Sequence, residues 1–243
     1  MKIRGERECT SCGTRWSYYE TGSVGCPACG SLQSVGLDER TEHTDLEVEF
    51  DLTSIRTDVD ETETAELAER ARDSAREYVR RRGFVRGGKL RPLEDDYLAA
   101  IELLHVADVV ARARTLDERE ELYFLALLRD ADRGERPPIE DVPETLRAAR
   151  GLAYANAARE FRRDVRTWAD DRDLESTAQA TLELLGDHVK RIRMLDGDVS
   201  SRTAETLVEA TGELTAGLER DDEDALERAR ERLDDLEYEN ASG

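Results

Sequence analysis

Residues 146–168 read LRAARGLAYANAAREFRRDVRTW. Apolar or small side chains recur along this stretch every three or four positions, which is the spacing of one face of an α-helix. These positions are Leu146, Ala149, Ala153, Ala157, Phe161, Val165 and Trp168. A helix with one apolar face buries that face against another element, so the stretch predicts a body of packed helices.

Segments of the same periodicity lie on both sides of this helix. Before it, we expect helices at about 62–82 and 93–114, and a third from Thr115, where a capping box with Glu118 opens it, to Gly134. Pro143 suits the first turn of the helix quoted above. A fifth helix has a seam in four-three alternation, made of Leu174, Ala178, Thr181, Leu185, His188, Ile192 and Leu195.

Two further amphipathic helices complete the predicted body. Their apolar positions are Ala204, Leu207, Thr211, Leu214 and Leu218 in the sixth, and Leu226, Ala229, Leu233 and Leu236 in the seventh. Amphipathic helices joined by short loops pack on one another. The predicted fold class is therefore mainly α, an antiparallel helical bundle preceded by a small β ribbon that contains the four cysteines of the chain.

The chain divides into three segments by composition. Residues 1–40 are rich in Gly, Ser, Thr and Cys and predict the ribbon, whereas residues 61–243 predict the α-helical bundle. Residues 41–60 lie between them as a strand or a linker. Within that segment, LEVEFDL at 46–52 alternates apolar and acidic side chains, which favours one half-buried strand or an extended connection.

The four cysteines form two matched knuckles. Cys9-Thr-Ser-Cys12-Gly and Cys26-Pro-Ala-Cys29-Gly each place two thiolates on one side of a turn, and the glycine supplies the positive φ that the turn needs. Four ligands leave no open position for water, so we predict one structural Zn²⁺ held by Cys9, Cys12, Cys26 and Cys29. Rubredoxin-like iron and a redox dithiol are the alternatives. Aromatic side chains of the spacer, Trp16, Tyr18 and Tyr19, are expected to cover the metal.

The two knuckles resemble the zinc ribbons of the transcription factor B type. The whole chain, including GGKLRP at 87–92 and DRGERPP at 132–138, resembles an uncharacterised family of halophilic archaeal proteins that carry such a ribbon. The resemblance implies a zinc ribbon followed by helices, and it implies no activity. The paired cyclin-like repeats that follow the ribbon of a true transcription factor B are missing from this sequence.

The charge of the chain indicates its environment. Acidic residues number 57 against 36 basic ones, for a net charge of −21, and only Lys2, Lys89 and Lys190 are lysines. This composition is typical of cytosolic proteins from extreme halophiles. No apolar run approaches the ~18 residues of a membrane span, and no signal region precedes the first knuckle. We expect a soluble cytoplasmic protein that contacts no membrane.

One segment departs from the acidic background. Residues 76–91 contain seven cations against the single acid Glu77. The functional interpretation is contact with phosphate or nucleic acid, in which Tyr78 and Phe84 are available for stacking. The candidate contact residues are Arg80, Arg81, Arg82, Arg86, Lys89 and Arg91. The alternative is pairing inside the protein with carboxylates such as Glu94, Asp95 and Asp96.

Two further patterns match known binding motifs only in part. The segment from Gly83 to Lys89 has P-loop spacing, but Leu90 replaces the Ser or Thr that binds the metal, so a Gly-rich turn between helices is expected. Glu102 and His105 have the Glu-x-x-His spacing of di-iron bundles, although the second pair is missing. An exposed or rim polar stripe, made of Glu102, His105, Asp108 and Arg112, is favoured there. We also expect His188 to be a core or boundary residue and His43 to lie in a polar linker.

These observations support a non-enzymatic binding protein whose ribbon and helical body recognise nucleic acid or a component of transcription or translation. A first alternative is an enzyme or metal-binding bundle with a second metal site near Glu102 and His105. A second is a scaffold that forms a homodimer through its C-terminal helices. The sequence shows no catalytic constellation, and protein and nucleic acid both stay open as partners.

Overall fold

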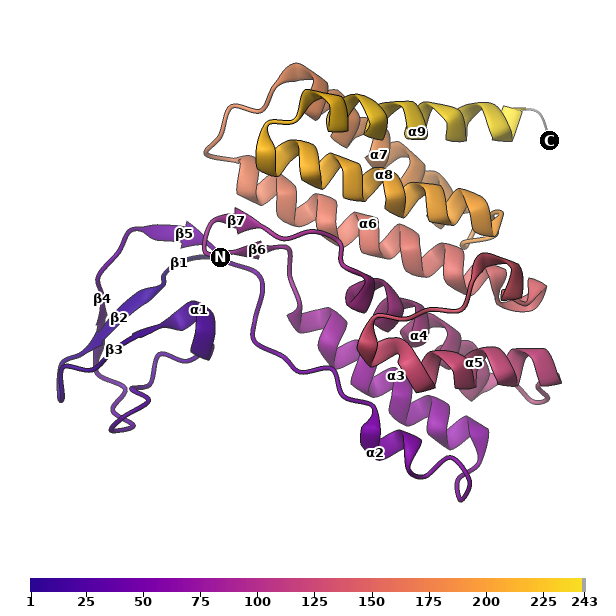
Figure 1. Cartoon of the computed structure of the whole chain (residues 1–243), viewed down its shortest axis with the longest axis horizontal. Helices are drawn as coiled ribbons and strands as arrows, with labels where there is room; N and C mark the ends of the chain where they lie inside the picture. The colour runs from indigo at the N-terminus through magenta and orange to yellow at the C-terminus, as the bar shows by residue number, and fades with distance from the viewer. Residues whose placement is uncertain (242–243) are drawn as a thin grey trace.

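A computed structural model describes residues 1–241 of the chain. The ribbon forms a small lobe beside a larger helical body (Figure 1). Its elements are β1 (Lys2–Arg4), β2 (Glu6–Cys9), β3 (Arg15–Ser17), α1 (Tyr18–Thr21), β4 (Ser34–Gly36) and β5 (Arg40–Glu42). Strand β2 lies between β3 and β4 in an antiparallel sheet, and β1 pairs with β5. The predicted class, mainly α with a small N-terminal β region, is confirmed.

The helical body has its own sequence of elements. Its long helices are α3 (Thr64–Arg81), α4 (Asp95–Arg112), α5 (Glu118–Asp130), α6 (Arg147–Ala169), α7 (Ser176–Met194), α8 (Ser201–Arg220) and α9 (Glu223–Ala241). The short elements are α2 (Thr53–Arg56), the strands β6 (Val85–Arg86) and β7 (Lys89–Leu90), and 3₁₀ turns η1 (Ala131–Arg133), η2 (Ile139–Asp141) and η3 (Glu144–Leu146).

Helix α4 joins two groups of helices. Helices α2 to α5 surround one core, and α6 to α9 surround a second, as Figure 1 shows. Tyr97 and Ile101 of α4 belong to the second core, whereas Leu103 and Val106 belong to the first. Because α4 is covered on both sides, its apolar side chains are not confined to one stripe.

Several predicted helix ends differ from the structure. The capping box of α5 is formed by Asp117 and Glu120, so the predicted box of Thr115 and Glu118 is wrong by two residues. The side chain of Asp117 accepts from the Glu120 amide, and Glu120 accepts from the Asp117 amide. The predicted seam of α7 ends at Ile192, because Leu195 lies beyond the helix and is exposed.

The C-terminal helices use their apolar residues within the chain. Leu226, Ala229, Leu233 and Leu236 of α9 are buried with residues of α7 and α8 in one core. The apolar positions of α8 belong to the same core. The predicted homodimer through these helices stays a prediction, and these side chains are not free to form it.

The segment between ribbon and body is extended. Residues 43–52 form no β-pairing, so they make the extended connection and not the strand. The amides of Thr44 and Asp45 donate to the Val85 carbonyl at 2.8 and 3.2 Å, and the Leu46 amide donates to Arg81 at 2.9 Å. These bonds hold the connection along the body. No helix among the described residues is long and apolar enough to cross a membrane.

Candidate metal centre and charged pockets

The four cysteines converge at the tip of the ribbon. All four Sγ atoms lie within 4.8 Å of one another. The Sγ atoms of Cys9 and Cys29 are 3.7 Å apart, and those of Cys12 and Cys26 are 3.5 Å apart. Sulfurs at the ~2.3 Å bond length of a tetrahedral zinc site lie about 3.8 Å apart, whereas a disulfide needs about 2 Å. The residues therefore fit one metal ion.

The two knuckles repeat the same backbone geometry. The Gly13 amide donates to the Cys9 carbonyl, and the Gly30 amide donates to the Cys26 carbonyl, each at 2.9 Å. Both glycines have positive φ, +74° and +71°. The Ser11 amide lies 3.4 Å from the Cys9 sulfur. Turns of this kind aim amide groups at the sulfurs, which stabilises thiolate charge.

Hydrogen bonding also favours the thiolate form of one of the cysteines, Cys12. The Thr14 hydroxyl lies 3.2 Å from the Cys12 sulfur. This contact, followed by the Thr14 amide, lowers the pKa of Cys12 to about 6. Because the thiolate is the form that ligates metal, a lowered pKa favours binding at neutral pH.

One aromatic residue covers the metal site, and two others face the body. Trp16 is buried with Cys9 and Cys26, and its indole donates to the Ser23 carbonyl at 3.0 Å. The prediction that Tyr18 and Tyr19 also cover the metal is wrong. Both rings pack on His43, and the Tyr19 hydroxyl lies 2.5 Å from the Thr41 hydroxyl.

His43 belongs to the junction between ribbon and body. The residue is buried, so its predicted place in a polar linker is corrected. Its Nδ1 accepts from the Gly87 amide at 3.3 Å. The aromatic contacts with the ribbon explain the burial, because they cover the imidazole from the side opposite the body.

The segment with P-loop spacing is a β-hairpin, consistent with the expected Gly-rich turn between helices. Strands β6 and β7 pair, and the two residues between them, Gly87 and Gly88, both have positive φ. A two-residue hairpin of this type needs positive φ at both positions. The Trp168 indole donates to the Gly88 carbonyl at 2.8 Å, so the hairpin is attached to α6.

The basic segment meets a buried carboxylate. Asp45 is 3% exposed and lies 2.7 Å from Arg91, 3.5 Å from Arg86 and 3.7 Å from Arg82. Glu94 pairs with Arg82 at 2.5 Å and with Arg91 at 2.8 Å. Three of the six candidate phosphate contacts, Arg82, Arg86 and Arg91, thus form ion pairs within the protein.

The other candidates of the segment lie at the surface. Arg80 and Arg81 pair with Glu77 on their own helix, and Lys89 is exposed on β7. Of the carboxylates expected to pair with the segment, Glu94 does so. Asp95 pairs with Arg136 at 3.0 Å, and Asp96 accepts from the Tyr78 hydroxyl at 2.6 Å.

Glu102 lies in the core and not on an exposed stripe. It is fully buried, and the hydroxyls of Tyr123 and Tyr154 both donate to its carboxylate. Arg150 Nη1 lies 3.7 Å from the same carboxylate. The predicted polar stripe is wrong for Glu102, because the turns of α4 that carry it are covered by α5 and α6. It holds for Asp108 and Arg112, which pair at 2.7 Å near the surface.

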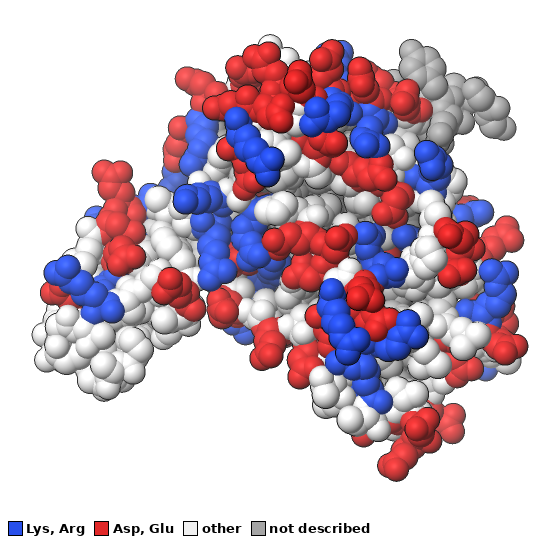
Figure 2. All heavy atoms as spheres, in the orientation of Figure 1, with Lys and Arg blue, Asp and Glu red and all other residues white. Residues whose placement is uncertain are grey.

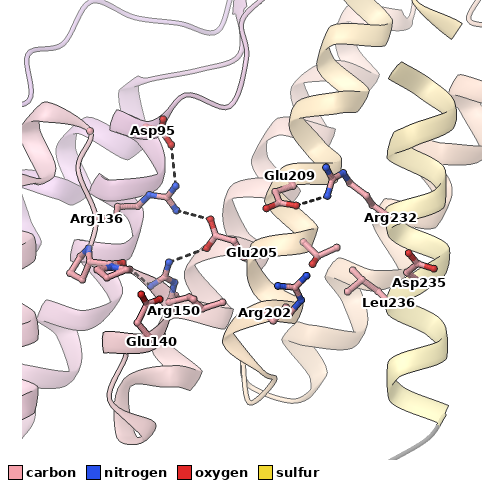
Figure 3. A pocket seen from close by; sticks show the side chains of 15 residues that line it. Asp95, Arg136, Glu140, Arg150, Arg202, Glu205, Glu209, Arg232, Asp235 and Leu236 are labelled. Atoms are coloured by element: carbon pink, nitrogen blue, oxygen red, sulfur yellow. Dashed lines mark hydrogen bonds and ion pairs between the residues drawn. The ribbon is translucent and has the colours of Figure 1, made fainter. Parts of the chain in front are cut away.

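A cavity of about 640 Å³ lies beside this buried network (Figure 3). Arg150 reaches Glu205 at 2.9 Å, and Arg136 lies 3.6 Å from Glu205 and 3.0 Å from Asp95. Arg232 pairs with Glu209 on the opposite side. Because opposite charges are paired across this cavity, its lining has little net charge with which to recognise an ion.

The structure does not assemble a second metal site around Glu102 and His105. The Glu102 carboxylate already accepts from two hydroxyls, and His105 Nε2 lies 3.2 Å from the Asn156 amide. Among the side chains that the structure describes, the four cysteines are the one cluster of His, Cys, Asp or Glu close enough to share an ion. His188 is buried in α7, as expected.

Comparison with known proteins assigns a family. Residues 1–233 match a family described as a family of unknown function, DUF7117. The chain belongs to this family. No curated protein and no solved structure matches the chain. Since the match runs from the first strand of the ribbon into α9, the DUF7117 unit includes both the metal knuckles and the helical body.

Charge is distributed unevenly over this DUF7117 protein. Figure 2 shows red and blue side chains mixed over the helical body, whereas much of the ribbon lobe is white. Residues 21–37, which include the second knuckle, contain no charged residue. Val24, Leu32, Val35 and Leu37 of this segment are exposed. Sequence reasoning missed this surface, although the uncharged run is visible in the sequence.

Proposed function

We propose that the protein is a non-enzymatic binding protein whose zinc ribbon docks on a protein partner. The observation that carries the proposal is the exposed, uncharged surface of residues 21–37 beside the metal knuckles. Leu32 has 77% of its surface exposed in a chain where 38% of residues are charged. Exposed apolar side chains gathered on one surface are typical of protein interaction sites.

The metal has a structural role, in which it holds the two knuckles together, and it takes part in no reaction. Four thiolates saturate a tetrahedral ion, so a zinc ion here has no position for a substrate. Tetrahedral sulfur ligation suits zinc and iron alike. We favour zinc because two short knuckles with one buried tryptophan resemble the transcription factor B type. Metal-binding thiols also need a reducing compartment, which supports a cytoplasmic location.

A protein is a better partner for this surface than a nucleic acid. Neutralising the phosphate charge of a nucleic acid depends on Lys and Arg, and residues 21–37 contain no cation. Two cations of the ribbon sheet are engaged, since Arg15 pairs with Glu8 at 2.5 Å and Arg7 donates to the Ser34 hydroxyl. Docking of an uncharged surface costs little desolvation, which favours an apolar partner. The transcription factor B resemblance favours a component of transcription or translation.

A photoreactive amino acid placed at position 32 tests the proposal. We expect it to cross-link one discrete protein in cells, and we expect Cys26→Ser to abolish that product. Position 122 is the matched control, because Leu122 is exposed on α5, away from the ribbon. Equal cross-linking from both positions, or cross-links to nucleic acid alone, would refute docking by the ribbon surface.

Metal analysis of the purified protein tests the cofactor separately. One zinc per chain agrees with the proposal. Additional iron or manganese that survives Cys26→Ser would instead favour the alternative of a second site in the helical body.

A further inference from the structure

A second pocket lies between α3, α4 and α6, on the helical body. It encloses about 360 Å³, within the size range of small-molecule sites. Its lining residues come from α3, α4 and α6, together with Thr44 and the segment 82–84 that precedes β6. Phe84, Ile101 and Leu104 supply apolar lining beside the charged residues.

The lining of this pocket is strongly basic. Five arginines, Arg76, Arg80, Arg82, Arg159 and Arg163, stand against the two carboxylates Glu160 and Asp164. His105 adds no charge at neutral pH, because burial lowers its pKa to about 4. The net charge of the lining is +3, whereas that of the whole chain is −21. Within this set, Arg163 pairs with Glu160 and Asp164. Arg82 pairs with Asp45 and Glu94, which lie outside the lining. A local excess of guanidinium groups is the usual means of binding phosphate.

Three of these arginines, Arg76, Arg80 and Arg159, have guanidinium N–H donors that are still available to a ligand. Arg76 pairs with Asp73 at 2.9 Å, and Arg80 pairs with Glu77, each within one helical turn. Arg159 pairs with the adjacent Glu160 at 2.5 Å. All three side chains are about half exposed or more, so these pairs contribute little to stability. Each guanidinium has five N–H donors, and the pairs occupy one or two.

Tyr97, a residue that lines the pocket, has a buried hydroxyl with no hydrogen-bond partner among the described residues. The residue as a whole is fully buried. The charged groups with the strongest electrostatic interaction with the Tyr97 hydroxyl are Glu160 and Asp164, followed by Arg163 and Arg82. All four residues line the same pocket. A buried donor without an acceptor is costly, and a ligand oxygen would supply the acceptor.

We propose that this pocket binds a small phosphorylated ligand, with the phosphate between the α3 and α6 arginines and the remainder on the apolar lining. The pocket shares no lining residue with the ribbon surface of residues 21–37. Its volume exceeds the ~30 Å³ share of one water about tenfold, which allows a ligand of nucleotide size.

Titration calorimetry in molar potassium chloride tests the proposal with three probes: pyrophosphate, AMP and a single-stranded oligonucleotide. We expect pyrophosphate or AMP to bind. Arg159→Gln should weaken binding at least about tenfold, which matches the loss of one charge-assisted hydrogen bond. The matched control is Arg129→Gln, because Arg129 also pairs with the next residue of its helix, Asp130, but lies on α5. This control should bind as the wild type does.

Tyr97→Phe provides a second variant that keeps the fold. Because the hydroxyl has no hydrogen-bond partner among the described residues, its removal should not lower stability, whereas it should weaken AMP binding severalfold. Failure of both pyrophosphate and AMP to bind would overturn the proposal. So would equal losses in Arg159→Gln and Arg129→Gln, or binding of the oligonucleotide alone.

Discussion

The clearest prediction concerns Asp45→Asn. The Asp45 side chain is 3% exposed and faces Arg82, which is equally buried, as well as Arg86 and Arg91. Breaking a buried ion pair costs about 3–5 kcal/mol, because the remaining charge stays buried. Glu94 still pairs with Arg82 and Arg91 in the variant, so we expect the lower end, about 3 kcal/mol. For a chain of this length the melting temperature should fall by about 6–12 °C.

Urea unfolding in molar potassium chloride, followed by circular dichroism, measures this loss. The control is Glu47→Gln, because Glu47 pairs with Arg86 at 3.3 Å but is 59% exposed. Exposed pairs contribute about 1 kcal/mol or less, so this variant should unfold close to the wild type. If Asp45→Asn were no less stable than Glu47→Gln, the carboxylate would not hold the basic segment, and those arginines would be available for a partner.

Three further predictions concern the metal, the charge and one histidine. Cys26→Ser should remove the metal and unfold the ribbon while the helical circular dichroism signal persists, because so small a lobe has little core besides its ion. Transfer from molar to tens of millimolar salt should lower the melting temperature, since repulsion within a chain of charge −21 is then unscreened. Burial lowers the pKa of His105 from 6.5 to about 4. The unfolded chain therefore binds an extra proton between these values, so stability should fall as pH drops through that window, and His105→Gln should reduce this slope in unfolding experiments.

Local patterns were sufficient to predict the metal site and the helices. The Cys9 and Cys26 knuckles are each built by residues a few positions apart, so their spacing alone indicates their geometry. Apolar periodicity likewise predicted the long helices, with ends displaced by a few residues. The displaced capping box of α5 illustrates the limit, because Thr115 and Asp117 both precede a suitable Glu and the sequence does not rank them.

Long-range contacts decided the remaining features. The burial of Glu102 depends on Tyr123 and Tyr154, which stand on two other helices, so its exposure could not be inferred from α4 alone. His43 is buried only because the ribbon folds back onto the body.

The basic segment shows the same division between sequence and structure. Its excess of positive charge is evident from composition, but whether an arginine is paired or available depends on residues elsewhere in the chain. Asp45 comes from the connection before α3, whereas Arg159 and Arg163 come from α6. The sequence by itself determined the two cysteine knuckles and the helical periodicity, because both depend on neighbours within one or two turns. Only the tertiary structure decided which charges lie together, because electrostatic pairing depends on distance in space and is independent of separation along the chain.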